Sequence, residues 1–560
     1  MTRARSPFVI EVIGNRLESI TKQMSAVIER TAYSSVVRES LDFSTALFDR
    51  DGYLVAQAEN IPQHLGSMGM VLRDAVFPVY SPDSWTDGDQ VAFNHPYFGG
   101  GHTPDIYLFS PIMVKNQLLG FSGSVCHHID VGGASPGSLA NNVTSLFQEG
   151  LLLPPVKLIR GGLWDDAMIR LIRANVRAPD LLMGDLESQV AANISAGTWV
   201  RDVVTHYGPE TVMQAMQAWL THTEQEVRQA IRDWPDGVYQ GEGFLDDDGV
   251  RVGQRIRFAV SIQIAADRII FDMRGSDDQA LGPVNCVPAQ VWSVAAYVTR
   301  CITNPHIPQN DGALRPIEVR LRPGSILAPT PPAPVGARFL TTMRLSDVAL
   351  RALVGAHPAW MLAGGAANDC AVTLAGIDPR TGRYGVYYEI NGGGTGARRG
   401  QDGADGIDMY VGNCMNAPVE AAEMEYPVRF LCYGLRENSG GRGTYRGGMG
   451  IRRDIRIEAE EMSLTLRSDA ESTSPPGIDG GEEGLPGEKW VYTQGKWMRL
   501  YSKVTDKQLK RGDILSIRTP GGGGVGPPTD RDIQQQREDQ AAGLYDAGTN
   551  DTVRADQRRS

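Results

Sequence analysis

Histidines and aspartates gather in one short part of this sequence. Four of its nine histidines lie between residues 94 and 133, and three of these fall in the runs Gly-Gly-Gly-His-Thr-Pro-Asp (99–105) and Cys-His-His-Ile-Asp (126–130). Two imidazoles and one carboxylate that converge are a usual ligand set for Zn²⁺ or a related divalent ion. We therefore predict a metal held by His102, Asp105 and His127, with His128 and Asp130 as reserves or as hydrogen-bond partners of the ligands.

The spacing of the two runs fits a β-hairpin. Residues 106–114 and 117–126 are apolar and strand-like, and the two residues between them suit a tight turn. Such a hairpin places Asp105 opposite Cys126 and beside His127, and a proline in the first strand can add a bulge that shifts this register. The alternative is a polar cluster that caps the strand ends and holds no metal.

Other parts of the sequence offer groups for acid–base chemistry. The run Arg-Glu-Ser-Leu-Asp-Phe-Ser (38–44) and the pair Gln63-His64 could bind substrate, or could form a buried hydrogen-bond network. Asn-Asp-Gly at 310–312 is first of all a turn signal, and the glycine loop within 389–403 could shape a pocket or a tight structural turn. The candidates for a general base are Asp42, His64, His128 and Asp130.

The standard nucleotide-binding loops are missing. The sequence contains no GxxxxGK[ST] run, and its glycine clusters do not open a helix after a strand as a dinucleotide-binding GxGxxG run does. We therefore expect ATP, if it is used, to be bound by another chain. The net charge of −12 argues against nucleic acid as a partner.

The cysteines and the apolar stretches indicate where the chain works. Six cysteines occur without a CxxC pair, which is typical of reduced, buried thiols in the cytoplasm. No stretch reaches the 18 apolar residues that suggest a membrane span, and charged residues interrupt the N-terminal apolar run. We expect a cytoplasmic chain with no membrane partner.

Apolar periodicity predicts the elements that must position these residues. A helix is expected over 7–33, a helical hairpin over 179–235 with a break at Gly208-Pro209, and a helix over 343–363. Strands and glycine loops fill most of the rest, so we predict an α+β fold: a large interwoven body of several layers, rich in mixed or antiparallel sheet. The predicted parts are a tail (1–6), a first part with the long helix, the hairpin and the helical insert (7–235), a β-rich second part packed on the first (236–528) and a polar tail (529–560), which begins with a short helix.

Seven motifs, in their expected order, resemble those of the hydantoinase B/oxoprolinase family. The similarity runs from about residue 7 to residue 528. The motifs are Arg-Glu-Ser-Leu-Asp-Phe-Ser (38–44), Gly-Gly-Gly-His-Thr-Pro-Asp (99–105), His-His-Ile-Asp-Val-Gly-Gly (127–133), Pro-Gln-Asn-Asp-Gly with Arg-Pro (308–316), Pro-Val-Glu (418–420), Tyr-Arg-Gly-Gly-Met-Gly (445–450) and Thr-Pro-Gly-Gly-Gly-Gly (519–524).

This resemblance implies that the chain is one subunit of an enzyme and that it needs a partner subunit. Such chains pair with a hydantoinase A-type subunit that carries the ATP and Mg²⁺ site, in a heterotetramer with two copies of each subunit. In carboxylase relatives an HxxD motif and a downstream histidine hold a metal, and that pattern maps onto His102, Asp105 and His127; Zn²⁺ and Mn²⁺ suit these ligands best.

Three functions follow as hypotheses. The first is an ATP-dependent amidase that opens a hydantoin, lactam or 5-oxoproline ring. The second is a subunit of an ATP-dependent ketone carboxylase of the acetone or acetophenone type. The third is a non-catalytic role, in which the chain only holds its partner in an active shape. The sequence does not name the substrate, since these activities share one scaffold.

Overall fold

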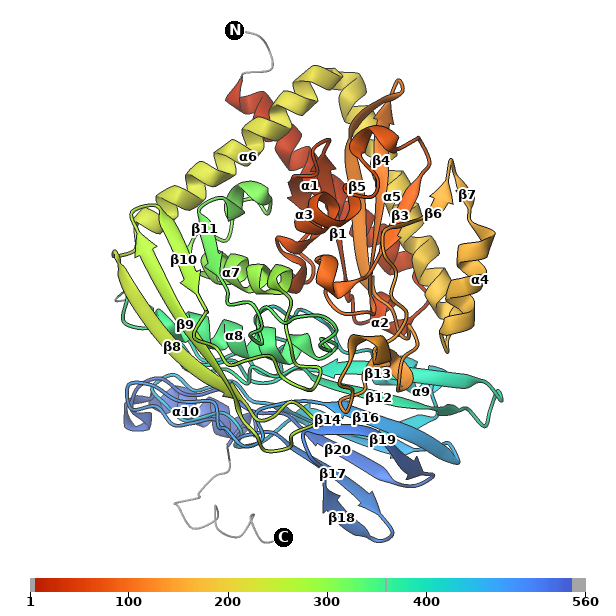
Figure 1. Cartoon of the computed structure of the whole chain (residues 1–560). Helices are drawn as coiled ribbons and strands as arrows, with labels where there is room; N and C mark the ends of the chain where they lie inside the picture. The colour runs from red at the N-terminus through yellow and green to blue at the C-terminus, as the bar shows by residue number, and fades with distance from the viewer. Residues whose placement is uncertain (1–5, 358–359, 546–560) are drawn as a thin grey trace.

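The computed structural model describes residues 6–357 and 360–545, and these form four β-sheets with helices around and between them (Figure 1). The named strands pair in antiparallel fashion except β10 (Arg268–Asp272) and β11 (Ile317–Arg320), which run parallel. The predicted α+β class, with several layers and mixed or antiparallel sheet, is confirmed.

The first sheet carries the histidine-rich window. It has seven strands in the order β2-β1-β5-β4-β3-β6-β7, so β4 and β5 lie near its centre. Both faces of these central strands are covered, which explains why they read as continuous apolar runs in the sequence. The strands are β1 (Phe43–Asp49), β2 (Leu54–Gln57), β3 (Gln90–Phe93), β4 (Asp105–Val114), β5 (Gln117–His127), β6 (Val156–Arg160) and β7 (Leu163–Trp164).

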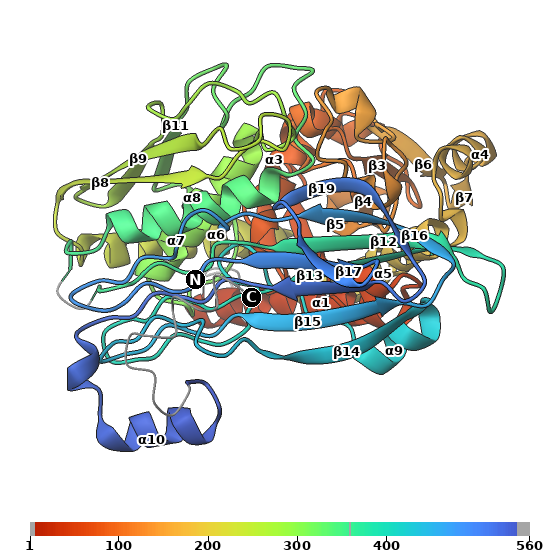
Figure 2. The same cartoon turned by 90° about the horizontal axis from the view of Figure 1, so that it is seen from below.

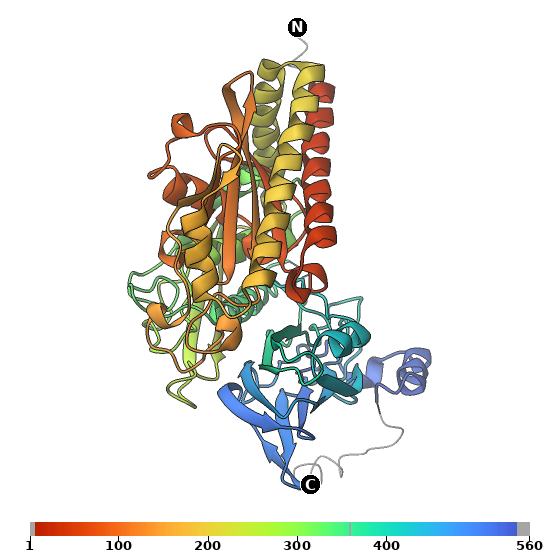
Figure 3. The same ribbon diagram turned by 90° about the vertical axis from the view of Figure 1, so that its right-hand side faces the viewer.

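Three long helices stand side by side against this sheet (Figure 3). They are α1 (Pro7–Thr31), α5 (Pro179–Tyr207) and α6 (Pro209–Arg232). The buried side chains of α1 recur at steps of three and four, which confirms the predicted first helix to within two residues. The predicted break is confirmed too. Gly208 has φ 83°, a conformation that favours glycine, and Pro209 occupies the first position of α6, where its missing N–H costs nothing.

A second, four-stranded sheet and two helices lie next to the first sheet. The strands are β8 (Gly237–Leu245), β9 (Ile256–Ala265), β10 and β11, and the helices are α7 (Pro288–Ile302) and α8 (Arg338–Ala352). The predicted helix over 343–363 was wrong at both ends. The chain turns at Gly355 (φ 85°), and Ala363 and Ala366 then donate backbone hydrogen bonds to a glycine loop instead of continuing a helix.

The last two sheets form the other end of the molecule. One contains β13 (Tyr384–Asn391), β12 (Cys370–Ile377), β16 (Glu461–Arg467) and β19 (Lys503–Lys510) in that order. The other contains β14 (Val428–Leu435), β15 (Ile451–Ile457), β20 (Ile514–Arg518), β17 (Glu488–Thr493) and β18 (Lys496–Arg499). Shorter helices complete the fold: α2 (Ser35–Arg38), α3 (Ser67–Val71), α4 (Asp166–Asn175), α9 (Val419–Glu425) and α10 (Ile533–Ala541).

The apolar core connects the predicted parts of the chain. The largest cluster of buried apolar side chains runs from α1 to the loop after β13, so it draws on both sides of residue 236, and a second cluster lies between the last two sheets. The predicted boundary at 236 therefore stays a prediction.

The two ends of the chain complete the description. The expected short helix near 530 is α10, at the periphery of the molecule (Figure 2). The predicted tails lie outside the described residues before residue 6 and after residue 545. In the part of the chain that the structure describes, no helix has the length and apolar content to cross a bilayer.

Candidate metal centre

The hairpin of β4 and β5 brings two of the predicted ligands face to face. Lys115 and Asn116 form its two-residue turn, both with positive φ, as the turns that match the strand twist require. Asp105 pairs with His127, so the predicted pairing with Cys126 was wrong by one residue. The cause is a bulge between Ile112 and Met113, which shifts the register by one position.

Three side chains converge at the end of this hairpin. His102 Nε2 lies 2.9 Å from Asp105 Oδ1 and 3.0 Å from His127 Nδ1. The distance from His127 Nδ1 to Asp105 Oδ1 is 3.4 Å. All three residues are buried, and one ligand atom of each lies within 4.8 Å of the others. This buried group could bind a metal ion.

Hydrogen bonds orient these side chains as ligands. His102 Nδ1 lies 3.1 Å from the carbonyl oxygen of Gly336, which can only accept, so Nδ1 carries the proton and Nε2 offers its lone pair to the cluster. Burial lowers the pKa of His102 to about 4, so its imidazole is neutral at pH 7, as a metal ligand must be. His127 Nε2 is buried and has no hydrogen-bond partner among the described residues.

Asp105 is held as a carboxylate. Burial alone would raise its pKa, but His102 and Arg338 lie beside it and hold the pKa well below its usual range. Arg338, the first residue of α8, donates from Nη2 to Asp105 Oδ2 at 2.6 Å. Gly101 leaves room for this contact: a Cβ there would lie 2.4 Å from Asp105 Oδ2 and 2.8 Å from Arg338 Nη2. The residues present therefore fit a divalent metal.

A pocket opens onto the cluster. Two predicted base candidates line it, although both are distant from the hairpin in sequence. Asp42 Oδ2 lies 3.8 Å from His127 Nδ1, and burial raises the pKa of Asp42 to about 6. His64 Nε2 lies 4.0 Å from Asp105 Oδ2, and burial lowers the pKa of His64 to about 4.

The other two candidates do not line this pocket. His128 Nε2 lies 3.2 Å from Gln189 Oε1 in the interior. Asp130 accepts hydrogen bonds from the backbone of Gly132 and Gly137 and pairs with Arg177 at 3.0 Å. The contacts of Asp130 fix the loop after β5, and a part for His128 and Asp130 in the chemistry stays a prediction.

The weaker candidate sets also have structural partners. Asp311 accepts from Arg73 Nη1 at 2.6 Å and from the backbone of Leu54. Glu389 is ion-paired with Arg453. None of these side chains lines the pocket beside the histidines.

Sequence reasoning missed several groups that line the pocket. They come from the start of α8, the residue before β12, β13 and the loop after it, and they are Arg338, Asp369, Tyr388 and Asp408. The ring of Tyr388 stacks on His127 with centroids 5.0 Å apart. The only signal was a single charge among apolar residues, as in Ala-Ala-Asn-Asp-Cys-Ala-Val (366–372), and such a charge carries no spacing pattern.

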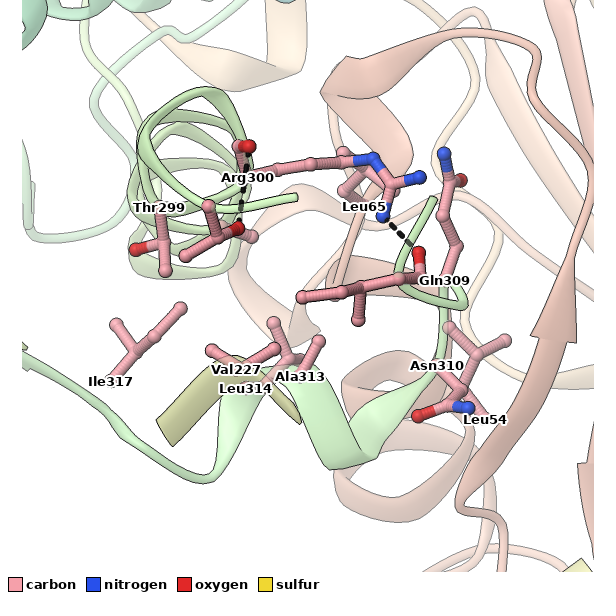
Figure 4. Close-up of a pocket in the computed structure, with 14 residues that line it drawn as sticks. Leu54, Leu65, Val227, Thr299, Arg300, Gln309, Asn310, Ala313, Leu314 and Ile317 are labelled. Carbon is pink, nitrogen blue, oxygen red and sulfur yellow. Dashed lines mark hydrogen bonds between the residues drawn. The ribbon is translucent and has the colours of Figure 1, made fainter. Parts of the chain in front are cut away.

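A second pocket lies away from this site, between α6, α7 and the segment before β11 (Figure 4). Most of its lining is apolar, including Leu65, Val227 and Leu314. Arg300 is the one charged side chain among its described lining residues, and its guanidinium donates to the carbonyl oxygens of Ile307 and Pro305 at 2.6 Å each. None of the described residues that line this pocket is a histidine, a cysteine or a carboxylate, whereas the histidine pocket is lined by all three types.

Two relatives of known name match this chain over most of its length. A protein named as the B-type subunit of a D-/L-hydantoinase, from Pseudomonas sp. (strain NS671), is 30% identical over 96% of this chain and 93% of its own length. The 5-oxoprolinase 1 of Arabidopsis thaliana is 31% identical over 92% of this chain, which spans only 41% of that longer protein.

Two solved structures share the fold. The ATP-dependent caprolactamase from Pseudomonas jessenii matches with a TM-score of 0.90 at 26% identity, over 97% of this chain and 94% of the other. An acetone carboxylase matches with a TM-score of 0.90 at 19% identity, over 97% and 78%, a likeness of fold alone. The family model of hydantoinase B/oxoprolinase matches residues 6–528, and this chain therefore belongs to the hydantoinase B/oxoprolinase family.

Proposed function

We propose that this chain is the metal-binding subunit of an ATP-dependent cyclic amidase, which opens a hydantoin, lactam or 5-oxoproline-type ring. The observation that carries the proposal is the buried convergence of His102, Asp105 and His127 beside a pocket. The names of the relatives, a hydantoinase subunit, an oxoprolinase and a caprolactamase, support the cyclic amide as the substrate class.

The proposal includes a partner. A hydantoinase A-type subunit would bind ATP and Mg²⁺ and phosphorylate the amide oxygen, and two copies of each subunit would form a heterotetramer. The absence of a P-loop run in this sequence supports this division of labour. The six free cysteines suit a reducing compartment, and we place the complex in the cytoplasm.

In this mechanism the side chains of this chain have distinct tasks. His102, Asp105 and His127 would hold one Zn²⁺ or Mn²⁺, which supplies Lewis acidity to a water or to the carbonyl group. Asp42, whose pKa is raised to about 6 by burial, is ionised at neutral pH and accepts a proton from the attacking water. His64, which is neutral, orients groups in the pocket, and Arg338 keeps Asp105 in place.

An activity assay tests the proposal. The chain is mixed with an ATP-binding hydantoinase A-type subunit and with hydantoin, caprolactam or 5-oxoproline, and ADP release and ring opening are measured together. We expect the two to be coupled, and lost in His102→Ala but kept in His222→Ala, an exposed histidine on α6.

Other outcomes select the remaining hypotheses. ATP use that requires a ketone and bicarbonate would identify a carboxylase, the activity for which one solved structure of this fold is named. Ring opening that survives in His102→Ala would leave only a structural role for the metal cluster.

A further inference from the structure

Two carboxyl groups in the wall of the histidine pocket lie against each other. Asp369 precedes β12 and Asp408 lies in the loop after β13, and both line the pocket. Asp369 is 3% exposed. The two side chains are neighbours, and each influences the pKa of the other. Two ionised carboxylates side by side in a buried wall repel each other, and a proton on one of them removes this repulsion.

The surroundings offer these two carboxyl groups few hydrogen-bond donors that could stabilise negative charge. Asp408 Oδ2 accepts from the backbone of Cys414 at 2.7 Å. No N–H or O–H group of the described residues donates to Asp369 Oδ1 or to Asp408 Oδ1. Burial raises the pKa of Asp369 well above its usual range, and the neighbouring Asp408 raises it further. Burial raises the pKa of Asp408 as well.

The charges of the whole pocket also require a proton. Asp42, Asp105, Asp369 and Asp408 face it, and Arg338 is the only arginine or lysine among its described lining residues. A divalent ion at the three ligands and the guanidinium would together balance three of the four carboxylates, because each buried negative charge needs its own compensation. One shared proton balances the fourth.

The other groups around the pair do not supply a positive charge in place of this proton. Tyr388 on β13 and Cys414 in the following loop have their pKa values raised by burial, so both are neutral at pH 7. Asp42, before β1, is itself an acid and adds negative charge near Asp369. Arg338 on α8 is already hydrogen-bonded to Asp105.

We propose that Asp369 and Asp408 share one proton at neutral pH and that this pair protonates the ring nitrogen as the C–N bond breaks. The second half of this inference rests on the proposed amidase function. An amine is a poor leaving group without a proton, and a carboxyl pair that retains one proton in the pocket is suited to supply it.

The protons balance in this step. A water forms a C–O bond to the phosphorylated ring carbon and gives one proton to Asp42. The C–N bond then breaks, and its electron pair goes to nitrogen, which takes the proton shared by Asp369 and Asp408. The new hydroxyl group becomes the carbonyl of the acyl phosphate, and its proton leaves with the amine as an ammonium group. Transfer of the proton from Asp42 to the pair restores the starting state. The acyl phosphate that remains is hydrolysed by a second water to the carboxylate and phosphate.

Infrared spectroscopy of the metal-loaded full chain tests the shared proton without substrate or partner. We expect a carboxylic acid C=O band at pH 7 that is weaker in Asp369→Asn and in Asp408→Asn than in wild type, while the part of the band due to Glu149 remains. The matched control Asp278→Asn, whose side chain is 86% exposed, keeps the band. No difference between wild type and either pair variant overturns the proposal, as do two metal ions per wild-type chain, since a second ion would replace the proton.

Kinetics of the complex with its ATP-binding partner test the transfer to nitrogen. Asp369→Asn should lower kcat by roughly 10²–10⁴-fold with an alkyl lactam, at unchanged KM and metal content. The loss should shrink with an analogue whose ring nitrogen carries an electron-withdrawing aryl group, because that nitrogen leaves without a proton. Equal losses with both substrates overturn this role. If wild type opens no ring at all, the amidase function fails, while the infrared result still decides the shared proton.

Discussion

Arg338 donates from Nη2 to Asp105 Oδ2 at 2.6 Å, while the other oxygen of Asp105 lies 2.9 Å from His102 Nε2. The two oxygens of Asp105 thus have different partners: Oδ2 contacts the buried guanidinium, and Oδ1 lies among the ligand atoms of the two histidines. The arginine fixes the plane of the carboxylate and compensates part of its charge, so it is a positioning residue for the proposed metal.

Replacing this arginine should weaken metal binding without removing a ligand. We expect Arg338→Met to lower the affinity for Zn²⁺ or Mn²⁺ by about 10- to 100-fold, because the carboxylate loses the partner that orients it. Competition with a chelator measures the affinity. The control Arg274→Met removes a 58% exposed side chain and should bind metal as wild type does. Equal affinities in wild type and Arg338→Met would contradict the positioning role.

The ligands themselves can be tested by metal content. Purified wild type should contain about one divalent metal per chain, and His102→Ala, Asp105→Ala and His127→Ala should each lose it, because three ligands from the protein are the usual minimum for such a site. Mass spectrometry of the metal measures the ratio. His95→Ala removes a nearby histidine outside the cluster and should retain the metal. A metal-free wild type would overturn the site.

Gly101, which precedes His102, leaves space for Asp105 and Arg338 because it has no side chain. Gly101→Ala places a Cβ 2.4 Å from Asp105 Oδ2, so the carboxylate or Arg338 must move, and we expect at least about a tenfold loss of metal affinity. Gly434→Ala is the matched control, because its Cβ meets nothing within 4 Å. Thermal unfolding separates misfolding from local change: a folded Gly101→Ala with full affinity would show that the contact does not matter.

The pH dependence of stability should reveal the raised pKa of Glu149. It accepts from the backbone of Val335 and Gly336, and burial raises its pKa from 4.5 to about 7. Between these values the folded state binds a proton that the unfolded state has lost, so the free energy of unfolding falls as pH rises. This group contributes a decrease of about 3 kcal/mol across that window.

The variant Glu149→Gln isolates this contribution. Urea unfolding at several pH values between 4.5 and 7 should show a weaker decrease of stability with pH in the variant than in wild type. Only the slope matters, because the variant also loses a hydrogen bond and with it some absolute stability. Parallel slopes would show that the pKa of Glu149 is not raised.

The sequence by itself determined the local elements and the candidate ligands. The 3.6-residue periodicity of α1 and the break at Gly208-Pro209 depend on which residue types follow one another, and they were predicted well. His102, Asp105 and His127 could be chosen because two strands and a two-residue turn join them, so sequence spacing gives their distance in space.

Only the tertiary structure decided the rest. The bulge after Ile112 changed the partner of Asp105, because one extra residue depends on how both strands pack. Asp369, Asp408 and Arg338 reach the pocket from three separate segments of the chain, and no spacing relates residues that meet only when sheets and helices pack. For the same reason His128 and Asp130, adjacent in sequence to a ligand, lie outside the pocket. Past the end of β5, a neighbour in the chain need not be a neighbour in the site.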